Sequence, residues 1–234
     1  MRYKIFLALL CAVNMWAEDV YAIFNAEAIK DAKLTLATSG IVEEIFVDVG
    51  SEVKENDVLL SLFNKDVQSQ MQSTQQQYLF AKKQYERYQR SGGAVDKNTL
   101  DKYYFEYKKL EADYAYQQAM LSKTQLKAPF DGIIAEKNIE LGDGVSANST
   151  DLFRIISKDV KLVLEFDFKY ASKVKVGDLF SFRIDGKPQN LEVKISKIYP
   201  TASTSTRKVK AEALASNVIP GTFGDGYIHV TEAK

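Results

Sequence analysis

The chain has 234 residues, of which 46% are hydrophobic, and its 31 Lys and Arg residues balance 31 Asp and Glu residues. This hydrophobic content excludes an intrinsically disordered chain and is sufficient for one large domain or two to three small ones. A net charge of zero offers a nucleic acid or an anionic surface no general attraction, so composition predicts no nucleic-acid partner.

Residues 1–17 have the pattern of a secretory signal peptide, with basic residues before a short apolar run and the first acidic residue at Glu18. The apolar run is too short to span a bilayer in the usual way, and the small side chain of Ala17 predicts cleavage behind it. The alternative is a lipid anchor on Cys11 at the end of this run. We disfavour that alternative because Leu10 occupies the position at which lipoprotein signals carry a small residue.

The mature chain has few side chains suited to catalysis or metal binding. If cleavage follows Ala17, no Cys remains, and His229 is the only His of the sequence. The alternating segment 227–230 predicts that His229 is a strand residue facing solvent, without a partner nearby in sequence. A hydrolase needs a nucleophile and a base, and a metal-handling protein needs clustered His or Met, whereas only Met71 and Met120 remain. We therefore expect no enzymatic activity, no catalytic residues, no cofactor and no metal site.

The most informative feature of the sequence is an internal repeat. Residues 40–53 match residues 132–145 without a gap, and residues 59–62 match residues 152–155 after one extra residue. Both copies have the pattern of short β-strands joined by Gly-containing turns. Neither copy is long enough to bury a face alone, so the two copies are expected to pack on each other as one β-sandwich.

The segment between the two copies, Asn64–Gln125, has the pattern of two long helices. It contains no Pro, and no Gly except the pair Gly92 and Gly93. On each side of this pair, apolar and Tyr residues recur at alternating spacings of three and four, the heptad pattern of two helices lying along each other. The predicted seams are Val67, Met71, Thr74, Tyr78, Ala81, Tyr85 and Tyr88, and Leu100, Tyr103, Tyr107, Leu110, Tyr114, Gln117, Leu121 and Thr124.

A break at Ser91–Val95 followed by Asp96 separates the two predicted helices. The two glycines end a helix at little cost, and Asp96 is a suitable N-cap for the next one. The helices must therefore run antiparallel, and the first would be roughly 40 Å long at 1.5 Å per residue. Taken alone, such a hairpin is equally consistent with a dimerisation arm or a spacer.

The arrangement of a two-part sandwich with a helical hairpin between its halves resembles the membrane fusion protein family, the periplasmic adaptors of bacterial export pumps. The most specific match is Leu126–Ile134, which is similar to the family's I-x-A-P-x-D-G-x-V motif, and Gly40–Leu59 is similar to its first half-motif with Asn56 where Gly is usual. Further segments resemble landmarks of the family's β-barrel domain, and Thr222 stands where Met usually follows the last Pro-Gly. These segments are Val174–Asp178, Ile198–Pro200, Thr206–Lys210 and Asn217–Gly221.

The resemblance implies a mainly β fold with a long α-helical hairpin, in which a lipoyl-like β-sandwich of two halves is interrupted by an antiparallel coiled coil and followed by a β-barrel domain. The sequence leaves little room for the membrane-proximal domain of longer adaptors. The expected division is a signal peptide over 1–17, strands joining the barrel over 18–37, the first lipoyl-like half over 38–63, the hairpin over 64–125, the second lipoyl-like half over 126–157 and the barrel domain over 158–234.

The resemblance also implies a function and partners. The chain would be a periplasmic protein peripheral to the inner membrane, the adaptor of a tripartite efflux pump. It would connect an inner-membrane transporter, of the resistance-nodulation-division (RND) class, with a TolC-like outer-membrane channel and would self-associate as a hexamer or trimer of dimers. An adaptor of an ABC-type exporter or type I secretion system is the alternative, and an adaptor for metal efflux is less favoured.

The family's hairpin tip implies where the channel would bind. TolC-docking adaptors carry Arg, Leu and Ser at set spacings, and this chain has Arg87, then Ser91 in place of Leu and Asp96 in place of Ser. The expected partner-binding residues are accordingly Arg87, Arg90, Ser91, Val95 and Asp96. A solvated turn without a partner is the alternative.

True lipoyl and biotinyl domains carry a modified Lys on a tight turn between their halves. In this chain the hairpin replaces that turn, so Lys65 and Lys123 should be unmodified residues that flank helices. A swinging-arm carrier is therefore not expected.

Overall fold

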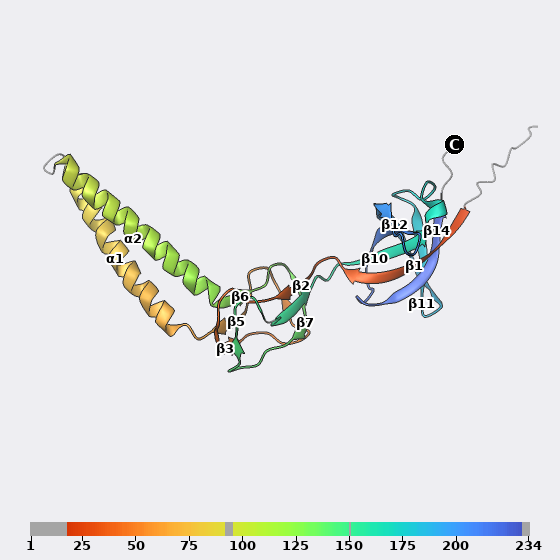
Figure 1. Ribbon diagram of the computed structural model, residues 1–234, viewed down its shortest axis with the longest axis horizontal. Coiled ribbons are helices and arrows are strands. Elements are labelled where there is room, and N and C mark those ends of the chain that lie inside the picture. The colour runs from red at the N-terminus through yellow and green to blue at the C-terminus, as the bar shows by residue number, and fades with distance from the viewer. Residues whose placement is uncertain (1–17, 92–95, 150, 231–234) are drawn as a thin grey trace, which may run out of the picture. The chain divides into compact units, whose positions relative to one another are not determined.

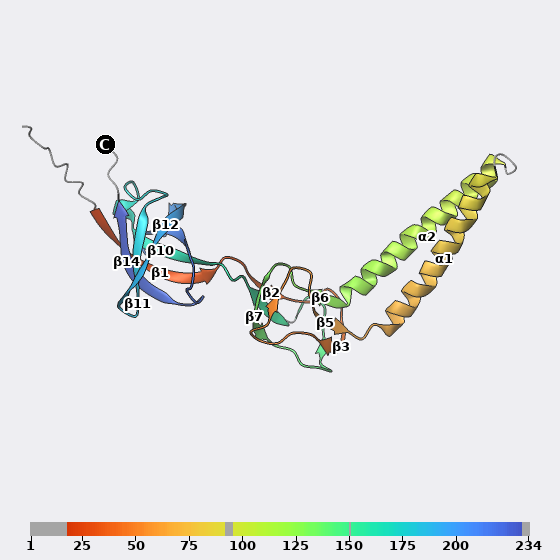
Figure 2. The ribbon, with the colours of Figure 1, turned by 180° about the vertical axis from the view of Figure 1, so that it is seen from behind.

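The computed structural model describes residues 18–91, 96–149 and 151–230 and divides into two compact units (Figures 1 and 2). Residues 30–158 form the first unit, a β-sandwich that carries a helical hairpin. Residues 18–29 together with 159–230 form the second unit, a closed β-barrel. Within the described ranges, no helix is both long and apolar enough to cross a bilayer.

Two four-stranded sheets make up the sandwich. One sheet has the order β2-β9-β7-β4 and the other β6-β5-β3-β8, with antiparallel neighbours throughout. The strands are β2 (Asp31–Leu34), β3 (Gly40–Ile45), β4 (Glu52–Val53), β5 (Val58–Leu62), β6 (Gln125–Lys127), β7 (Gly132–Lys137), β8 (Gly144–Val145) and β9 (Phe153–Ile156).

The two sequence repeats exchange strands reciprocally. In β4, Val53 pairs with Gly132 of the second copy, and in β8, Val145 pairs with Gly40 of the first copy. These two pairings are equivalent under the repeat, so the halves are related by an approximate two-fold axis. The prediction that the copies form one folding unit is thereby confirmed.

A single apolar core lies between the two sheets. Both copies contribute fully buried side chains, Leu59 and Leu60 from the first and Phe153 and Ile155 from the second. This joint core stabilises the pairing, because neither copy alone could remove these side chains from water.

The turns of the two copies are also equivalent. Gly50 and Gly142 both adopt positive φ angles, of 84° and 88°, in a region that favours glycine. Asn56, which replaces the glycine usual in the family's motif, has a φ of 71°. Asn tolerates this left-handed conformation better than most residues, which explains how the turn is kept without Gly.

The barrel is closed by six antiparallel strands in the order β1-β10-β13-β12-β11-β14. A 3-10 turn, η1 (Phe168–Tyr170), follows the second of them. Inward-facing residues such as Phe24, Phe166 and Phe180 are at most 2% exposed and form its core. The strands are β1 (Glu18–Ala28), β10 (Val160–Asp167), β11 (Leu179–Ile184), β12 (Lys187–Ala202), β13 (Lys208–Ala215) and β14 (Phe223–Val230).

The expected fold class is confirmed: a mainly β protein with a two-part sandwich, a helical hairpin and a barrel. One segment is distributed differently from the expected division. Of residues 18–37, only β1 belongs to the barrel, whereas β2 pairs with β9 in the sandwich. The separation follows from burial, since Leu34 lies in the sandwich core and Phe24 in the barrel core.

Candidate partner-binding site on the helical hairpin

The hairpin consists of α1 (Lys65–Arg90) and α2 (Lys97–Lys123), which lie side by side and antiparallel in both ribbon views (Figures 1 and 2). It leaves and re-enters the sandwich between the paired strands β5 and β6. At this base, the amide of Asn64 donates to the hydroxyl of Thr124 over 3.1 Å, and both residues are buried. The backbone N–H of Leu62 also donates to the carbonyl of Thr124. The sandwich therefore holds both helices at one point.

The contact between the helices is a ladder of stacked tyrosines rather than an aliphatic core. Tyr78 stacks on Tyr107 and Tyr114 at centroid distances of 5.9 and 5.7 Å, and Tyr85 stacks on Tyr107 at 5.8 Å. All predicted seam positions are buried or partly buried, but only three of them, Thr74, Ala81 and Thr124, reach full burial. The predicted heptad seam is confirmed, and most of its side chains remain partly exposed to solvent.

Hydroxyl groups extend this ladder into hydrogen bonds. The Tyr114 hydroxyl accepts from the side-chain amides of Gln75 and Gln118, each over 3.1 Å. The Tyr107 hydroxyl donates to Glu111 over 2.9 Å, and this bond raises the pKa of Tyr107. Such bonds satisfy the polar tips of the rings and fix the register of the two helices.

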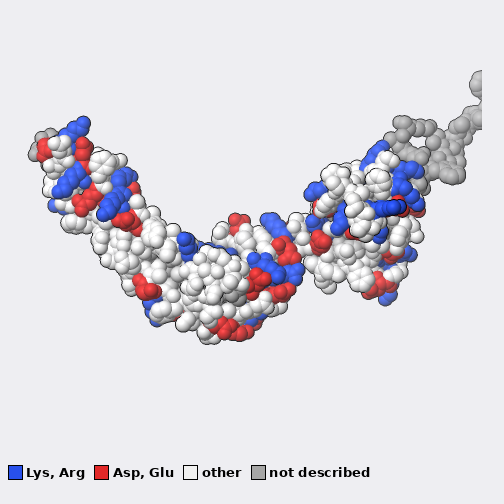
Figure 3. All heavy atoms as spheres, viewed as in Figure 1, with Lys and Arg blue, Asp and Glu red and all other residues white. Residues whose placement is uncertain are grey.

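Charge divides the hairpin along its length. In the half of the hairpin next to the sandwich, residues 67–81 and 114–122 carry no charged side chain. The half that ends in the tip has many charged side chains of both signs (Figure 3). In the uncharged half, Phe80 is 66% and Tyr116 61% exposed. The hairpin thus offers an apolar and Gln-rich flank near the sandwich and a charged end.

The expected tip residues that the structure describes all lie at this charged end and are exposed. Arg87 and Arg90 occupy the last turn of α1, where a cation interacts favourably with the helix dipole. Ser91 caps this helix, its hydroxyl donating to the carbonyl of Tyr88 over 2.6 Å.

Asp96 opens the second helix as its N-cap, as the sequence predicts. Its carboxylate accepts from the hydroxyl of Thr99 at 2.6 Å and from the Thr99 backbone N–H at 3.0 Å, and these bonds lower the pKa of Asp96. Val95 and the two glycines lie outside the described residues. The tip therefore presents two arginines and a capping carboxylate that is ionised at neutral pH.

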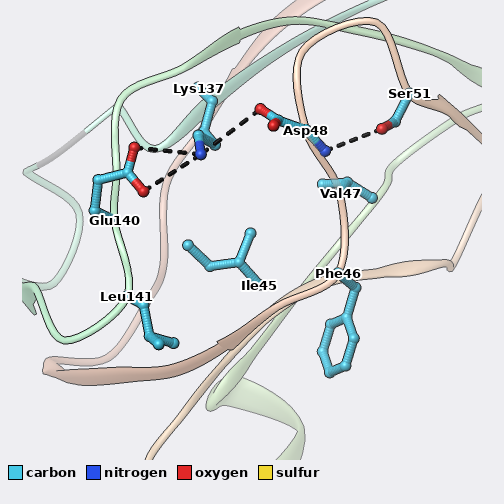
Figure 4. Close-up of a pocket in the computed structure, with 8 residues that line it drawn as sticks. All are labelled: Ile45, Phe46, Val47, Asp48, Ser51, Lys137, Glu140 and Leu141. Carbon is cyan, nitrogen blue, oxygen red and sulfur yellow. Dashed lines mark hydrogen bonds and ion pairs between the residues drawn. The ribbon is translucent and has the colours of Figure 1, made fainter.

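A second candidate surface is a hollow of about 510 Å³ at one side of the sandwich (Figure 4). The ammonium of Lys137 lies between the carboxylates of Asp48, at 3.6 Å, and Glu140, at 3.2 Å. Asp48 and Glu140 occupy equivalent repeat positions, so the two copies meet at this hollow. The bond to Glu140 raises the pKa of Lys137. The cation is already paired, and the arrangement ties the two halves together.

On the barrel, the structure reveals an arrangement that sequence reasoning missed. His229 is predicted from the sequence to be a strand residue facing solvent, with no partner near it along the chain. In the barrel, its Nε2 lies 2.6 Å from the Ser181 hydroxyl and its Nδ1 lies 2.7 Å from Asp19. The order Ser, His, Asp matches a hydrolytic triad. However, Ser181 sits within β11, which is paired on both sides, so its neighbouring amides are not turned toward an oxyanion. The chain of bonds links three barrel strands.

The remaining candidates from the sequence stand apart from one another. Lys65 begins the first helix, 3.8 Å from Glu43, and Lys123 ends the second helix, so neither lies on a tight turn. Over the part of the chain that the structure describes, no group of three or more His, Cys, Asp or Glu is placed to hold a metal ion.

Comparison with known proteins gives consistent family matches. The model of the CzcB-like barrel-sandwich hybrid domain matches residues 30–157, more than half of the chain. The cobalt-zinc-cadmium resistance protein CzcB of Cupriavidus metallidurans is 22% identical over 211 residues, which cover 83% of this chain and 40% of that protein. The cation efflux system protein CzcB of an Alcaligenes strain is 24% identical with the same coverage. The chain thus spans about 40% of the length of these relatives.

Solved structures show the same fold. A chimera of MacA and MexA containing the α-hairpin domain of Pseudomonas aeruginosa MexA superposes with a TM-score of 0.78 over 93% of this chain and 82% of that structure, at 21% sequence identity. At this identity the likeness establishes the fold, including a hairpin carried by a sandwich.

Proposed function

Because the chain belongs to the CzcB-like family of membrane fusion proteins, which are periplasmic adaptors, we propose that it is the adaptor of a tripartite efflux pump. It would act in the periplasm, at the inner membrane, between a transporter of the RND class and a TolC-like outer-membrane channel. The observation that carries this proposal is the hairpin, held by both halves of a strand-exchanged sandwich. An ABC-type partner is the alternative transporter.

The geometry supports a scaffold role rather than a chemical one, as in the non-enzymatic adaptor family. Force and cargo selection would come from the transporter, while the chain supplies a protrusion with a charged end. Arg87 and Arg90 would donate to carboxylates or carbonyls of the channel, and Ser91 and Asp96 would provide a hydroxyl and an acceptor.

Self-association would place copies side by side. The uncharged half of the hairpin, with Phe80 and Tyr116 exposed, suits lateral contact between hairpins because burial of such side chains stabilises association. A hexamer or a trimer of dimers would arrange the tips in a ring that matches a tubular channel.

Metal cations are the cargo that the relatives favour. In the sequence analysis, metal efflux is the less favoured alternative, because the mature chain has no cluster of His or Met. Two relatives, however, are named for cobalt, zinc and cadmium resistance or for cation efflux. We propose a pump for divalent transition-metal cations in which the transporter binds the ion.

Susceptibility of a deletion strain tests both levels of this proposal. Deletion of the gene should raise sensitivity to Co²⁺, Zn²⁺ or Cd²⁺ as much as deletion of the partner transporter does, and the cloned gene should restore resistance. Sensitivity only to drugs or bile salts would keep the adaptor role and overturn the metal cargo. Unchanged susceptibility to all of them, with normal expression of the partner pump, would contradict the adaptor role itself.

A further inference from the structure

One end of the barrel combines exposed apolar side chains with unpaired cations. It is the end at which β1 begins and β10, β12 and β14 finish, and the loops 168–178 and 203–207 cover it. We call it the terminal end of the barrel. Figure 3 shows Lys and Arg side chains gathered there, although the net charge of the whole chain is zero.

The two loops form one ordered surface. Val174 is 3% exposed and enters the barrel core, and Tyr170 packs against the same core, so the first loop is anchored from below. The backbone N–H of Phe168 donates to the carbonyl of Arg207 over 3.1 Å, which joins the first loop to the second. The backbone of both loops is therefore held in place on the barrel.

Two apolar side chains of the first loop point away from the core. Phe168 is 59% exposed and Val176 is 61% exposed, although the neighbouring Val174 shows that the loop can bury an apolar side chain. An aromatic and an aliphatic residue displayed on an anchored loop have the character of membrane-interface anchors.

Cations surround these apolar residues. Lys169, Lys175 and Arg207 are exposed, and none of them has an ion pair with another described residue. The acids beside them, Asp167 and Asp178, accept the backbone N–H groups of Lys169 and Lys175 over 2.9 and 2.7 Å. The carboxylates thus stabilise the turns. The Lys169 ammonium lies 4.8 Å from the centroid of the Tyr170 ring, and no ion pair of Lys169 or Lys175 has to break before a partner binds.

Glu18 and Asp19 begin the barrel at this end, and Asp19 is bonded to His229. With Asp167 and Asp178 they make four acidic residues, against five basic residues, which are Lys169, Lys173, Lys175, Arg207 and Lys208. The terminal end therefore has a small excess of basic residues.

A hollow beside Phe168 adds a place for a headgroup. It has a volume of about 360 Å³ and a mainly apolar lining, formed by Asp167, Phe168, Lys169, Ala202, Ser203, Thr204 and Arg207. Arg207 has a φ of 55°, a left-handed conformation that is unfavourable for a residue other than Gly. Of the lining residues, Lys169 and Arg207 have the donor chemistry that binds a phosphate, whereas the carboxylate of Asp167 opposes an anion.

We propose that the terminal end of the barrel docks on the anionic phospholipid surface of the membrane. Phe168 and Val176 enter the interface, and Lys169 and Arg207 bind headgroup phosphates. Since one lipid chain gives only reversible attachment, a basic and apolar protein surface would supply the second signal if Cys11 is lipidated.

This inference goes beyond the proposed adaptor function and does not depend on the pump or its cargo. It is tested with purified protein and vesicles, so its failure would leave the susceptibility test untouched.

Vesicle binding gives the test. The full chain is exported and purified as the cell processes it, its mass is determined, and it is sedimented with vesicles of phosphatidylcholine or of phosphatidylcholine with phosphatidylglycerol. Binding to the anionic vesicles should be at least tenfold stronger. The variant K169Q/R207Q should lose about 25-fold of that binding, because each of the two cations near an anionic surface contributes roughly fivefold. F168S/V176S should weaken binding comparably.

Matched controls stand elsewhere on the molecule. K54Q/K127Q removes two exposed cations from the sandwich unit, and F223S removes a phenylalanine that is 70% exposed at the opposite end of the barrel. Both should bind as the wild type does. Circular dichroism and thermal melting establish that every variant is folded.

A fluorescent variant locates the contact. Trp16 is the only Trp of the sequence, so F168W places the one reporter in a chain cleaved behind Ala17. Its emission should shift to the blue on anionic vesicles and be quenched by lipids brominated near the headgroup. Equal binding to both vesicle types, no binding, or unchanged binding of the variants would overturn the proposal. The proposal would also be overturned if these variants kept their vesicle binding and lost only the capture of the transporter.

Discussion

The sandwich core and the hairpin seam both hold paired elements together, the first by buried aliphatic and aromatic side chains and the second by partly exposed tyrosines. In the sandwich, Leu59, Leu60 and Phe153 are fully buried, whereas the seam buries little beyond Thr74 and Ala81 and relies on stacked tyrosines. Removing apolar surface from water is worth about 25 cal/mol per Å², so the sandwich has a large reserve of stability and the hairpin a small one. The difference shows that the sandwich is the rigid base and that the hairpin depends on being held there.

The largest effect is expected in the sandwich, at Gly132. A Cβ at this position would lie 2.4 Å from the carbonyl oxygen of Ile156, so β7 and β9 would have to separate. Gly132→Ala should reduce the free energy of unfolding of the sandwich by about 3 kcal/mol, the upper range for overpacking. Hydrogen exchange resolved by segment would measure this loss separately from the barrel and the hairpin.

Gly40 occupies the equivalent position of the first repeat and provides the matched control. There the nearest atom is the flexible Cδ1 of Leu62 at 2.9 Å, and at Gly144 nothing lies within 4 Å. Gly40→Ala should therefore cost less than Gly132→Ala, and Gly144→Ala should cost almost nothing. Equal effects at all three glycines would refute the steric explanation.

The second largest loss of stability is expected in the barrel, on removal of a nearly buried charge. Glu212 accepts from Lys161 at 2.7 Å, from Tyr199 at 2.6 Å and from Lys197 at 3.3 Å, and these bonds lower its pKa to about 2. Because the folded pKa lies below the ordinary 4.5, the stabilisation is complete above about pH 4.5 and is lost as the pH falls toward 2.

Glu212→Gln should cost on the order of 2 to 3 kcal/mol at pH 7 and much less near pH 2. Barrel stability measured by denaturant titration at several pH values would show the two curves converging in acid. Parallel curves would mean that Glu212 does not carry this pH dependence.

In the seam, the expected effect is smaller and local. Tyr85 stacks on Tyr107 and contacts Tyr104, so Tyr85→Asp should destabilise the hairpin by about 1–2 kcal/mol through lost stacking and burial of a charge. Tyr107→Asp should act in the same direction, because Tyr107 joins two rungs of the ladder. Exchange in the two helices should accelerate while the sandwich stays protected. Unaltered melting together with full export would contradict the role of the ladder.

The smallest effect is expected at the base. Asn64→Ala would remove the bond to Thr124 and should cost about 1 kcal/mol, mainly as faster exchange in the first turn of α1 and the last turn of α2. Gln76→Ala, an exposed position of the same helix, should leave exchange unchanged. An equal increase in exchange along both helices would show that the hydrogen bond at the base does not stabilise the helix ends separately from the seam.

Features that are local or periodic in the sequence were predictable. The repeat predicts that its two copies pack on each other as one sandwich, because neither copy can bury a face alone. The structure adds the reciprocal pairing of Val53 with Gly132 and of Val145 with Gly40. Heptad spacing located the tyrosine seam, and an Asp after a glycine pair located the cap at Asp96. The seam and the cap have causes that act over a few residues, whereas the sandwich could be predicted because its two halves match position by position.

Features created by closure of the barrel were not predictable. Asp19 lies 210 positions before His229, and only the pairing of β1 with β14 brings them together. The same holds for Glu212 and its three donors, which come from two other strands. At the tip, the sequence placed Arg87, Arg90, Ser91 and Asp96 at the hairpin end, but their affinity for a channel depends on the channel's own surface.

Cross-linking from the hairpin in living cells tests the central claim most directly. A photoreactive residue is placed at Ser91, at the end of the hairpin, and in a separate strain at Gln76, in its uncharged half. If the hairpin reaches the outer membrane, Ser91 captures a TolC-like channel and Gln76 does not. Capture of the channel equally from both positions, or of the inner-membrane transporter from Ser91, would contradict the account.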